Sequence, residues 1–222
     1  MRTPPLESGD RLTRAEFERR YAAMPRLKKA EFIEGMVFMP SPVSRPHAAA
    51  HAELITWLGA YRAATPGVEV ADNATVRLDL DNEPQPDALL RILPAAGGQS
   101  GDSEDDYVEG PPELVAEVAS SSASYDLHEK KHAYRRNGVR EYLVWLINEA
   151  RIEWWELREG EYVSLTLEEG LLKSRVFPGL WLDAEALLGG QSARVLAQLQ
   201  RGRESPEHAA FAAGLGARSR AA

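Results

Sequence analysis

The sequence predicts an α/β fold with a central mixed β-sheet flanked by helices and supplemented by antiparallel β-hairpins. Three observations predict it: a strand–helix–strand pattern over residues 113–147, a helical pattern over 47–64, and alternating apolar segments separated by turn residues elsewhere. The chain has 222 residues, 44% of them hydrophobic, which suits one well-packed domain and is short for two. We therefore expect a single domain over residues 11–201, preceded by a flexible arm (1–10) and followed by a disordered tail (202–222).

The central strand–helix–strand unit follows Pro111-Pro112, which can continue neither a helix nor a β ladder. Residues 113–119 are short and mostly apolar, as in a buried strand. A serine-rich turn then caps a helix over 125–136, which Asn137-Gly138 ends, and residues 139–147 form the second strand. This order favours parallel pairing of the two strands.

The remaining elements follow from turn residues and periodicity. Trp154 and Trp155 are adjacent in one expected strand, so one of them must point outward unless it is covered, and an exposed tryptophan there would indicate a dimer surface. The expected elements are a helix over 13–23, a hairpin over 30–39 turning at Glu34-Gly35, a helix over 47–64, strands within 68–80 and at 87–92, an acidic flexible loop over 94–112, a hairpin over 151–167, a strand over 171–177, and one helix from Asp183 to about residue 200.

Two carboxylates on neighbouring expected strands indicate a cation site. Glu117 lies in the middle of an apolar strand, where a carboxylate is costly unless something balances it. Asp87 stands about thirty residues upstream, after a proline pair and at the start of another apolar strand. Together they could hold a divalent cation, with Lys130 of the following helix orienting the metal-bound water or balancing a developing oxyanion.

Plainer alternatives stay open for the same residues. Glu117 could pair with Lys130 or Arg140 and do no chemistry, and Asp87 could be a turn residue. Asp126 lies in the first turn of the expected helix, where the helix dipole favours an acid, so we expect an indirect or structural role for it.

Histidine and cysteine content narrows the metal chemistry. His47 and His51 form an i, i+4 pair that could ligate a transition metal, but no zincin-type carboxylate motif follows, so zinc is a minor alternative. The chain has no cysteine, which excludes disulfides and thiolate metal sites.

Taken in order, a set of motifs resembles the Uma2 family, which is itself similar to the PD-(D/E)XK nucleases and restriction endonucleases. The similarity starts near residue 30, passes through His47 and extends to residues 177–180, so it covers about two-thirds of the chain. The motifs are Pro86-Asp87, EVASSS over 117–122, Asp126, Lys130, and YRRNGVREY over 134–142.

The resemblance implies a restriction-endonuclease-like core and Mg²⁺- or Mn²⁺-dependent cleavage of nucleic acid. Asp87, Glu117 and Lys130 would be the catalytic residues, and the backbone carbonyl of Val118 would join the two acids around the metal. The resemblance also places His47 and Glu34 near the site; with Asp126, they are candidates for supporting contacts.

Two positions depart from the expected patterns. Ala119 stands where the generic nuclease signature has its lysine, so that lysine would have to come from the helix, as Lys130. Leu143 stands where members of the family usually have tryptophan.

The formal charge of −8 argues against non-specific adhesion to nucleic acid, because Lys and Arg supply most of that affinity. A local basic face could still bind nucleic acid, DNA being the expected substrate; its candidates are Lys131, Arg135 and Arg136, with Arg140 beside them. Neither a signal peptide nor a stretch of membrane-span length is evident, so we expect a cytoplasmic protein with no membrane partner.

We expect a homodimer, since a chain this short needs two copies to cut both strands of a duplex. The alternative function is a non-catalytic binding or regulatory module that keeps the fold. A metal-dependent phosphoesterase for small substrates is a third interpretation. Convergence of Asp87, Glu117 and Lys130 in an open cleft would favour the nuclease.

Overall fold

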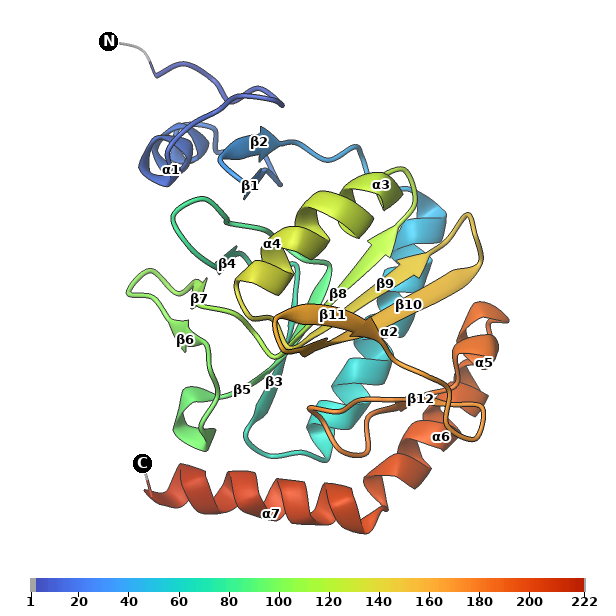
Figure 1. The fold of residues 1–222 in the computed structure, drawn as a ribbon. Coiled ribbons are helices and arrows are strands. Elements are labelled where there is room, and N and C mark those ends of the chain that lie inside the picture. Colours follow the sequence, from blue (N-terminus) through green and yellow to red (C-terminus); the bar gives the residue numbers. More distant parts are fainter. Residues whose placement is uncertain (1–2, 222) are drawn as a thin grey trace.

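The computed structural model describes residues 3–221 and has a six-stranded mixed sheet at its centre (Figure 1). The strand order is β11-β10-β9-β8-β5-β3; β8 and β9 are parallel and every other neighbouring pair is antiparallel. This confirms the predicted mixed sheet built around the strand–helix–strand unit. The strands are β3 (Val68–Asp72), β5 (Ala88–Ile92), β8 (Leu114–Ala119), β9 (Glu141–Leu146), β10 (Arg151–Arg158) and β11 (Glu161–Ser164).

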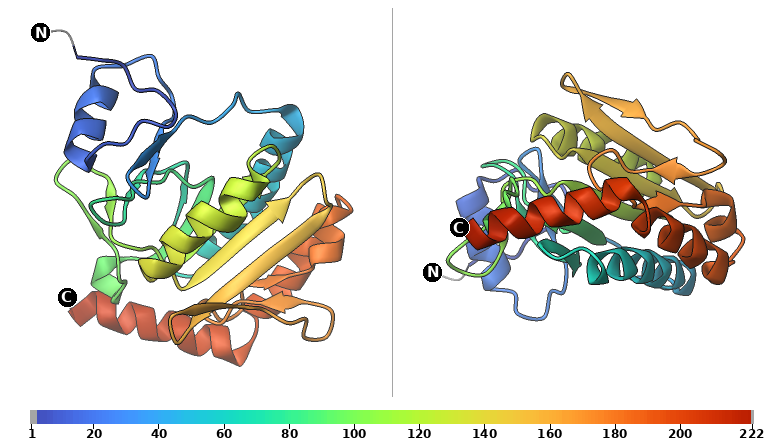
Figure 2. Two further views of the ribbon diagram at one scale, coloured as in Figure 1. Left: turned by 45° about the horizontal axis from the view of Figure 1, so that its top comes forward. Right: turned by 90° about the horizontal axis from the view of Figure 1, so that it is seen from below.

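Helices cover both faces of this sheet (Figure 2). One face packs against α2 (Arg45–Ala63), α5 (Ala184–Leu188) and α6 (Ser192–Arg203). The other face packs against a helical segment made of α3 (Ala123–Tyr125), a π-helical turn (Asp126–Lys130) and α4 (Lys131–Arg136). The expected helix over 125–136 therefore contains one wider turn.

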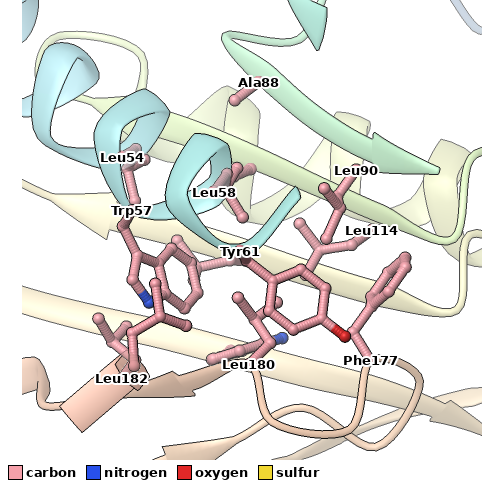
Figure 3. Packing of buried hydrophobic residues seen from close by; sticks show 14 of the residues in the cluster. Leu54, Trp57, Leu58, Tyr61, Ala88, Leu90, Leu114, Phe177, Leu180 and Leu182 are labelled. Atoms are coloured by element: carbon pink, nitrogen blue, oxygen red, sulfur yellow. The ribbon is translucent and has the colours of Figure 1, made fainter. Parts of the chain in front are cut away.

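Alternation along β8 distributes its side chains between the two faces. Ala116 and Val118 join the core under α2, where Trp57 and Tyr61 pack against the C-terminal elements (Figure 3). Val115 and Ala119 join the core under α4. Because side chains alternate along a strand, Glu117 points toward α4 with Val115 and Ala119.

Small sheets surround the central one. The hairpin predicted at Glu34-Gly35 is present, and both residues have positive φ. The short strands are β1 (Glu31–Ile33) with β2 (Met36–Phe38), β4 (Val76–Arg77) with β7 (Val108–Glu109) and β6 (Gly101–Asp102), and β12 (Leu172–Lys173) with β13 (Trp181–Leu182).

The expected flexible loop over 94–112 is instead ordered. It contains a 3₁₀ turn (Pro94–Ala96) and the strands β6 and β7, and Ala96 and Ser100 are buried. Arg91 holds the loop, because its guanidinium donates to the Gly101 carbonyl and the Asp102 carboxylate.

The prediction of a disordered tail over 202–222 is wrong. Residues Pro206–Ala221 form α7, which runs along the lower edge of the molecule in Figure 1. Leu215 is fully buried, and the ring of His208 lies 2.9 Å from the Thr65 hydroxyl. Only residue 222 of this tail lies outside the described residues.

Within the described residues, the N-terminal arm is also packed rather than loose; residues 1 and 2 lie outside the described range. Leu6 is buried with Phe17 of α1 (Arg14–Ala22), and Gly9 N donates to the Val37 carbonyl. The segment that precedes residue 11 therefore contributes to a small hydrophobic core at the N-terminal end of the protein.

Three other expectations are corrected. The single helix from Asp183 is two helices, because Gly189 and Gly190 separate α5 from α6. The strand expected over 171–177 is only β12. Both Trp154 and Trp155 are covered, one on each face of the sheet, which removes the argument for a tryptophan dimer surface.

Within residues 3–221, no helix is both long enough and apolar enough to span a membrane.

Candidate active site

Asp87 and Glu117 meet at one end of the central sheet. β5 and β8 are antiparallel, with Ala88 opposite Ala116, so the residue before β5 lies beside the end of β8. Asp87 Oδ2 accepts a 2.8 Å hydrogen bond from Val118 N, and Asp87 N lies 3.4 Å from Glu117 Oε2. The sheet register therefore places the two carboxylates side by side.

Lys130 reaches the same point from the π-helical turn. Its Nζ lies 2.8 Å from Glu117 Oε1, 2.9 Å from Glu31 Oε1 and 3.7 Å from Asp126 Oδ1. A π-helical turn inserts a residue into a helix and frequently occurs at functional sites. Here the turn contributes both Asp126 and Lys130, and both are buried.

Aromatic side chains close the inner side of the cluster. The Tyr134 hydroxyl donates to Glu117 Oε1 at 2.9 Å, and the Tyr142 hydroxyl donates to the Asp126 carbonyl at 2.9 Å. The Tyr125 ring stacks on Phe38, and its buried hydroxyl has no hydrogen-bond partner in the described part of the chain.

The outer side of the cluster is formed around Asp87. Lys29 Nζ lies 3.6 Å from Asp87 Oδ1, and His47 Nε2 lies 3.3 Å from Asp87 Oδ2. His51 Nε2 approaches the Asp87 carbonyl at 2.7 Å and Asp72 Oδ1 at 3.1 Å. Lys29 and His47 are partly exposed, so the site faces solvent between the segment before β1 and the start of α2.

The cluster has an excess of acidic groups. Three carboxyl groups (Glu31, Glu117, Asp126) contact the Lys130 ammonium, and a fourth, that of Asp87, belongs to the residue beside Glu117. None of these five residues exposes more than 6% of its surface. With every group ionised, the four negative charges face the positive charge of Lys130 and that of the partly exposed Lys29 beside Asp87, so two negative charges remain uncompensated. Since isolated buried charge is costly, the cluster must bind protons or a cation.

The pKa values reflect this excess. Burial raises the pKa of Glu117 to about 8; the charge of Lys130 opposes the shift and that of Asp87 adds to it. Burial also raises the pKa of Asp126. Burial alone would lower the pKa of Lys130, but the neighbouring carboxylates outweigh it and hold that pKa well above its ordinary value.

The donor set fits a hard divalent cation. Among residues 3–221, Asp87 Oδ1 has only the distant Lys29 ammonium as a partner, and Glu117 Oε2 has only the long contact from Asp87 N. No three His, Cys, Asp or Glu side chains of the described chain form a ready metal cage. Mg²⁺ suits such a site, because it is often held by one or two carboxylates and keeps several waters.

The zinc alternative gains no support. His47 and His51 both point at Asp87 oxygens, and their ring centroids lie 6.2 Å apart. They find no third side-chain ligand within the described residues.

Glu34, expected near the site, contacts none of the five charged side chains of the cluster. It occupies the hairpin turn at φ 51°, and its carboxylate lies 3.1 Å from Arg136 and 3.8 Å from His132. His47 and Asp126, by contrast, are in contact with Asp87 and Lys130.

The basic residues expected to bind nucleic acid already have partners. Lys131 Nζ lies over the Trp155 ring at 3.5 Å, Arg135 pairs with Glu161 at 2.9 Å, and Arg136 pairs with Asp79 at 3.0 Å. Arg140 donates to Gln99. This face therefore presents little free positive charge.

Sequence reasoning missed Glu31 and Tyr134. Glu31 stands in an apolar strand between Ala30 and Phe32, and it is 1% exposed. An acid within an apolar strand, the signal that marks Glu117, marks Glu31 as well. Tyr134 gave no such signal, because an aromatic residue at a helical position is usually a core residue.

A mixed sheet with helices on both faces, with two acids and a lysine at one end, places this protein in the restriction-endonuclease-like α/β class. A crystal structure of a "putative nuclease belonging to DUF820" from Anabaena variabilis has a similar fold, with a TM-score of 0.60 at 13% identity, covering 77% of this chain and 96% of that one. The Uma2 sequence profile, described as "Putative restriction endonuclease", matches residues 14–185. The chain belongs to the Uma2 family. No curated protein matches it.

Proposed function

We propose that this protein is a metal-dependent endonuclease that hydrolyses phosphodiester bonds of nucleic acid, with Mg²⁺ or Mn²⁺ held at Asp87 and Glu117. The observation that carries the proposal is the buried cluster of four carboxyl groups and one ammonium. A divalent cation would compensate this charge without a proton on Glu117. The family description supports the same reaction class.

Asp87 Oδ1, Glu117 Oε2 and the Val118 carbonyl are the proposed ligands. Along a strand, successive carbonyls point to opposite sides. The Ala119 carbonyl accepts from Ile147 N on the β9 side, so the Val118 carbonyl faces the Asp87 side, as does Val118 N. The bound cation would polarise a phosphoryl oxygen and make its water easier to deprotonate.

Lys130 would stabilise the phosphoryl charge that grows during hydrolysis. The water oxygen bonds to phosphorus, one ester P–O bond breaks, and the departing oxygen takes a proton while the attacking water loses one. Glu31 would act as a positioning residue, because its Oε1 lies 2.9 Å from the Lys130 ammonium, beside the 2.8 Å contact with Glu117.

The test combines metal binding with cleavage. Calorimetric titration of Mg²⁺ and Mn²⁺ into the wild type should show binding that Glu117→Gln removes, together with loss of plasmid and single-strand cleavage by at least a hundredfold. Glu149→Gln, an exposed acid in a turn, is the matched control and should behave as the wild type. Absence of metal binding by the wild type at millimolar concentration would rule out the proposal.

The second candidate is a non-catalytic binding module that retains the nuclease fold. The burial of the whole cluster favours it, since a substrate phosphate needs access to the Asp87 and Glu117 oxygens. A wild type that binds oligonucleotide but cleaves neither DNA nor RNA with any divalent ion would support this module.

Dimer formation and the choice of DNA over RNA remain predictions. The central sheet has two edge strands, β11 and β3, through which two copies could pair. Light scattering coupled to size-exclusion chromatography should give twice the 24.5 kDa chain mass if the homodimer forms.

A further inference from the structure

The basic residues that remain free near the site lie on its outer side, not on α4. Arg26 and Lys28 precede β1, and Arg45 begins α2; all three are exposed, and none forms an ion pair within residues 3–221. The acids outnumber the bases by 34 to 26 in this chain, so free cations beside an acidic cluster are unexpected on composition alone.

Arg26, Lys28 and Arg45 flank two residues that converge on Asp87. Lys29, next to Lys28, reaches Asp87 Oδ1 at 3.6 Å, and His47, two residues after Arg45, reaches Asp87 Oδ2 at 3.3 Å. The segment that follows β2 leads to the start of α2 at this end of the molecule (Figure 1). We call Arg26, Lys28, Lys29 and Arg45 the basic rim.

We propose that the basic rim binds the phosphate backbone of the nucleic-acid substrate and guides it to Asp87 and Glu117. This inference rests on the proposed function and names the surface that its substrate occupies. Phosphates flanking the scissile bond would contact Arg26, Lys28 and Arg45, and Lys29 would lie closest to the acids. Backbone contacts of this kind orient nucleic acid without reading its sequence.

The distribution of charge favours the basic rim as the surface on which a polyanion binds. The inner side of the cluster is closed by Tyr134 and Tyr142, which are fully buried. The cations of α4 are held by Glu161 and Asp79 or lie over Trp155. A polyanion approaching the outer side would meet Arg26, Lys28 and Arg45, which have no ion pair to lose within residues 3–221, while Lys29 is already beside Asp87.

The test uses the full chain carrying Glu117→Gln, without divalent ions, so that binding is measured in the absence of cleavage. Binding of a fluorescent single-stranded oligonucleotide and of a duplex is followed by anisotropy between about 50 and 300 mM salt, where the salt dependence of phosphate contacts is measurable. The rim variant is Arg26→Gln/Lys28→Gln/Arg45→Gln. Lys29 is left intact because it contacts Asp87.

The control removes the same charge elsewhere: Arg62→Gln/Arg201→Gln/Arg220→Gln. These residues are exposed and have no acidic partner in the described chain. Arg62 lies seventeen positions along α2 from Arg45, about 26 Å at 1.5 Å per residue.

The rim variant should bind at least tenfold more weakly at about 0.1 M salt, and the slope of log K against log salt should fall by about one per residue removed. The control should keep the parent slope. Equal behaviour of the two triple variants, or no binding by the parent at low salt, would overturn the rim.

Cleavage by the otherwise wild-type chain separates this inference from the proposed function. If the wild type cleaves nucleic acid in a metal-dependent way and the rim variant binds and cleaves as well as the wild type, the proposed nuclease function stands and the proposed role of the basic rim is rejected. If binding depends on the basic rim but no cleavage occurs, the role of the rim stands and the nuclease function is rejected.

Discussion

Three buried glutamates show why burial alone does not identify a catalytic acid. Glu113 accepts hydrogen bonds from Ile92 N and Gln99 N, and Glu141 accepts from two backbone amides and the Ser174 hydroxyl. Both oxygens of each carboxylate are used by local donors, as in a structural cap. Glu117 differs, because one oxygen binds Lys130 and Tyr134 while the other is nearly free.

Tyrosine hydroxyls at the cluster give a test at the residue scale. Tyr125→Phe should leave the free energy of unfolding unchanged or raise it by about 1 kcal/mol, because the lost hydroxyl is buried without a partner in the described chain. Tyr134→Phe should lower it by about 0.5–1.5 kcal/mol, since it removes the hydrogen bond from the Tyr134 hydroxyl to Glu117. Urea denaturation of both variants measures the difference; equal effects would contradict this assignment.

The sequence was sufficient to predict Asp87, Glu117 and Lys130 as neighbours. An acid inside an apolar strand, such as Glu117, can be recognised in the sequence. Pairing of neighbouring strands then brings Asp87, at the start of one strand, close to Glu117 near the end of the other. The supporting contacts were not predictable in the same way. Glu34 and Glu31 lie three residues apart, and only the hairpin register decides that Glu31 faces Lys130 while Glu34 faces Arg136.

At the scale of elements, α1 is joined to the strand region by a pair of acids. Glu83 is buried, and its backbone forms an isolated antiparallel bridge with Phe32. Arg77 Nε lies 3.2 Å from the carboxylate of Glu18 in α1 and 3.7 Å from that of Glu83. Burial, reinforced by Glu18, raises the pKa of Glu83 to about 8. A proton on Glu83 therefore favours this one contact, beside the Phe17–Phe32 stacking and the Arg77–Glu18 ion pair that also join α1 to the strand region.

This proton makes stability depend on pH. Below about pH 4.5 Glu83 is protonated in both the folded and unfolded states; between about 4.5 and 8 only the folded state retains the proton, so stability falls as pH rises. Glu83→Gln should remove this part of the slope and stabilise the protein at pH 8, by an amount on the order of a few kcal/mol. Urea midpoints from pH 5 to 8 measure it, with Glu149→Gln as control; an unchanged slope would contradict the shift.

Helix α7 shows where composition misleads. Residues 202–222 are rich in Gly, Ala and Arg, which suggested disorder, but alanine favours helix and a few apolar side chains suffice to anchor it. Leu215→Ala should cost about 2–5 kcal/mol, because the side chain is fully buried. Ala213→Ser, exposed on the same helix, should cost less than about 1 kcal/mol. A urea midpoint unaffected by Leu215→Ala would show that α7 does not pack.

At the scale of the whole molecule, the sheet and its covering helices were predictable, because strand–helix–strand order and apolar periodicity report directly on burial. The small sheets around the central one were less predictable from the sequence. Strands of two residues, such as β4 and β7, carry no periodicity and are held by neighbours distant in sequence.

Metal binding should stabilise the whole fold if the cluster holds a cation. A ligand at a hundred times its Kd adds about 2.7 kcal/mol to the free energy of unfolding. Mg²⁺ should therefore raise the melting temperature of the wild type and leave that of Glu117→Gln unchanged. Equal shifts in the two proteins would indicate that the ion binds elsewhere.

All five charged residues of the cluster lie between positions 31 and 130, and the family match ends at residue 185, before α6. The helices α6 and α7 contribute packing but no side chain to the cluster. Substitutions in α6 or α7 should therefore change the stability of the fold without changing the charges that surround Lys130.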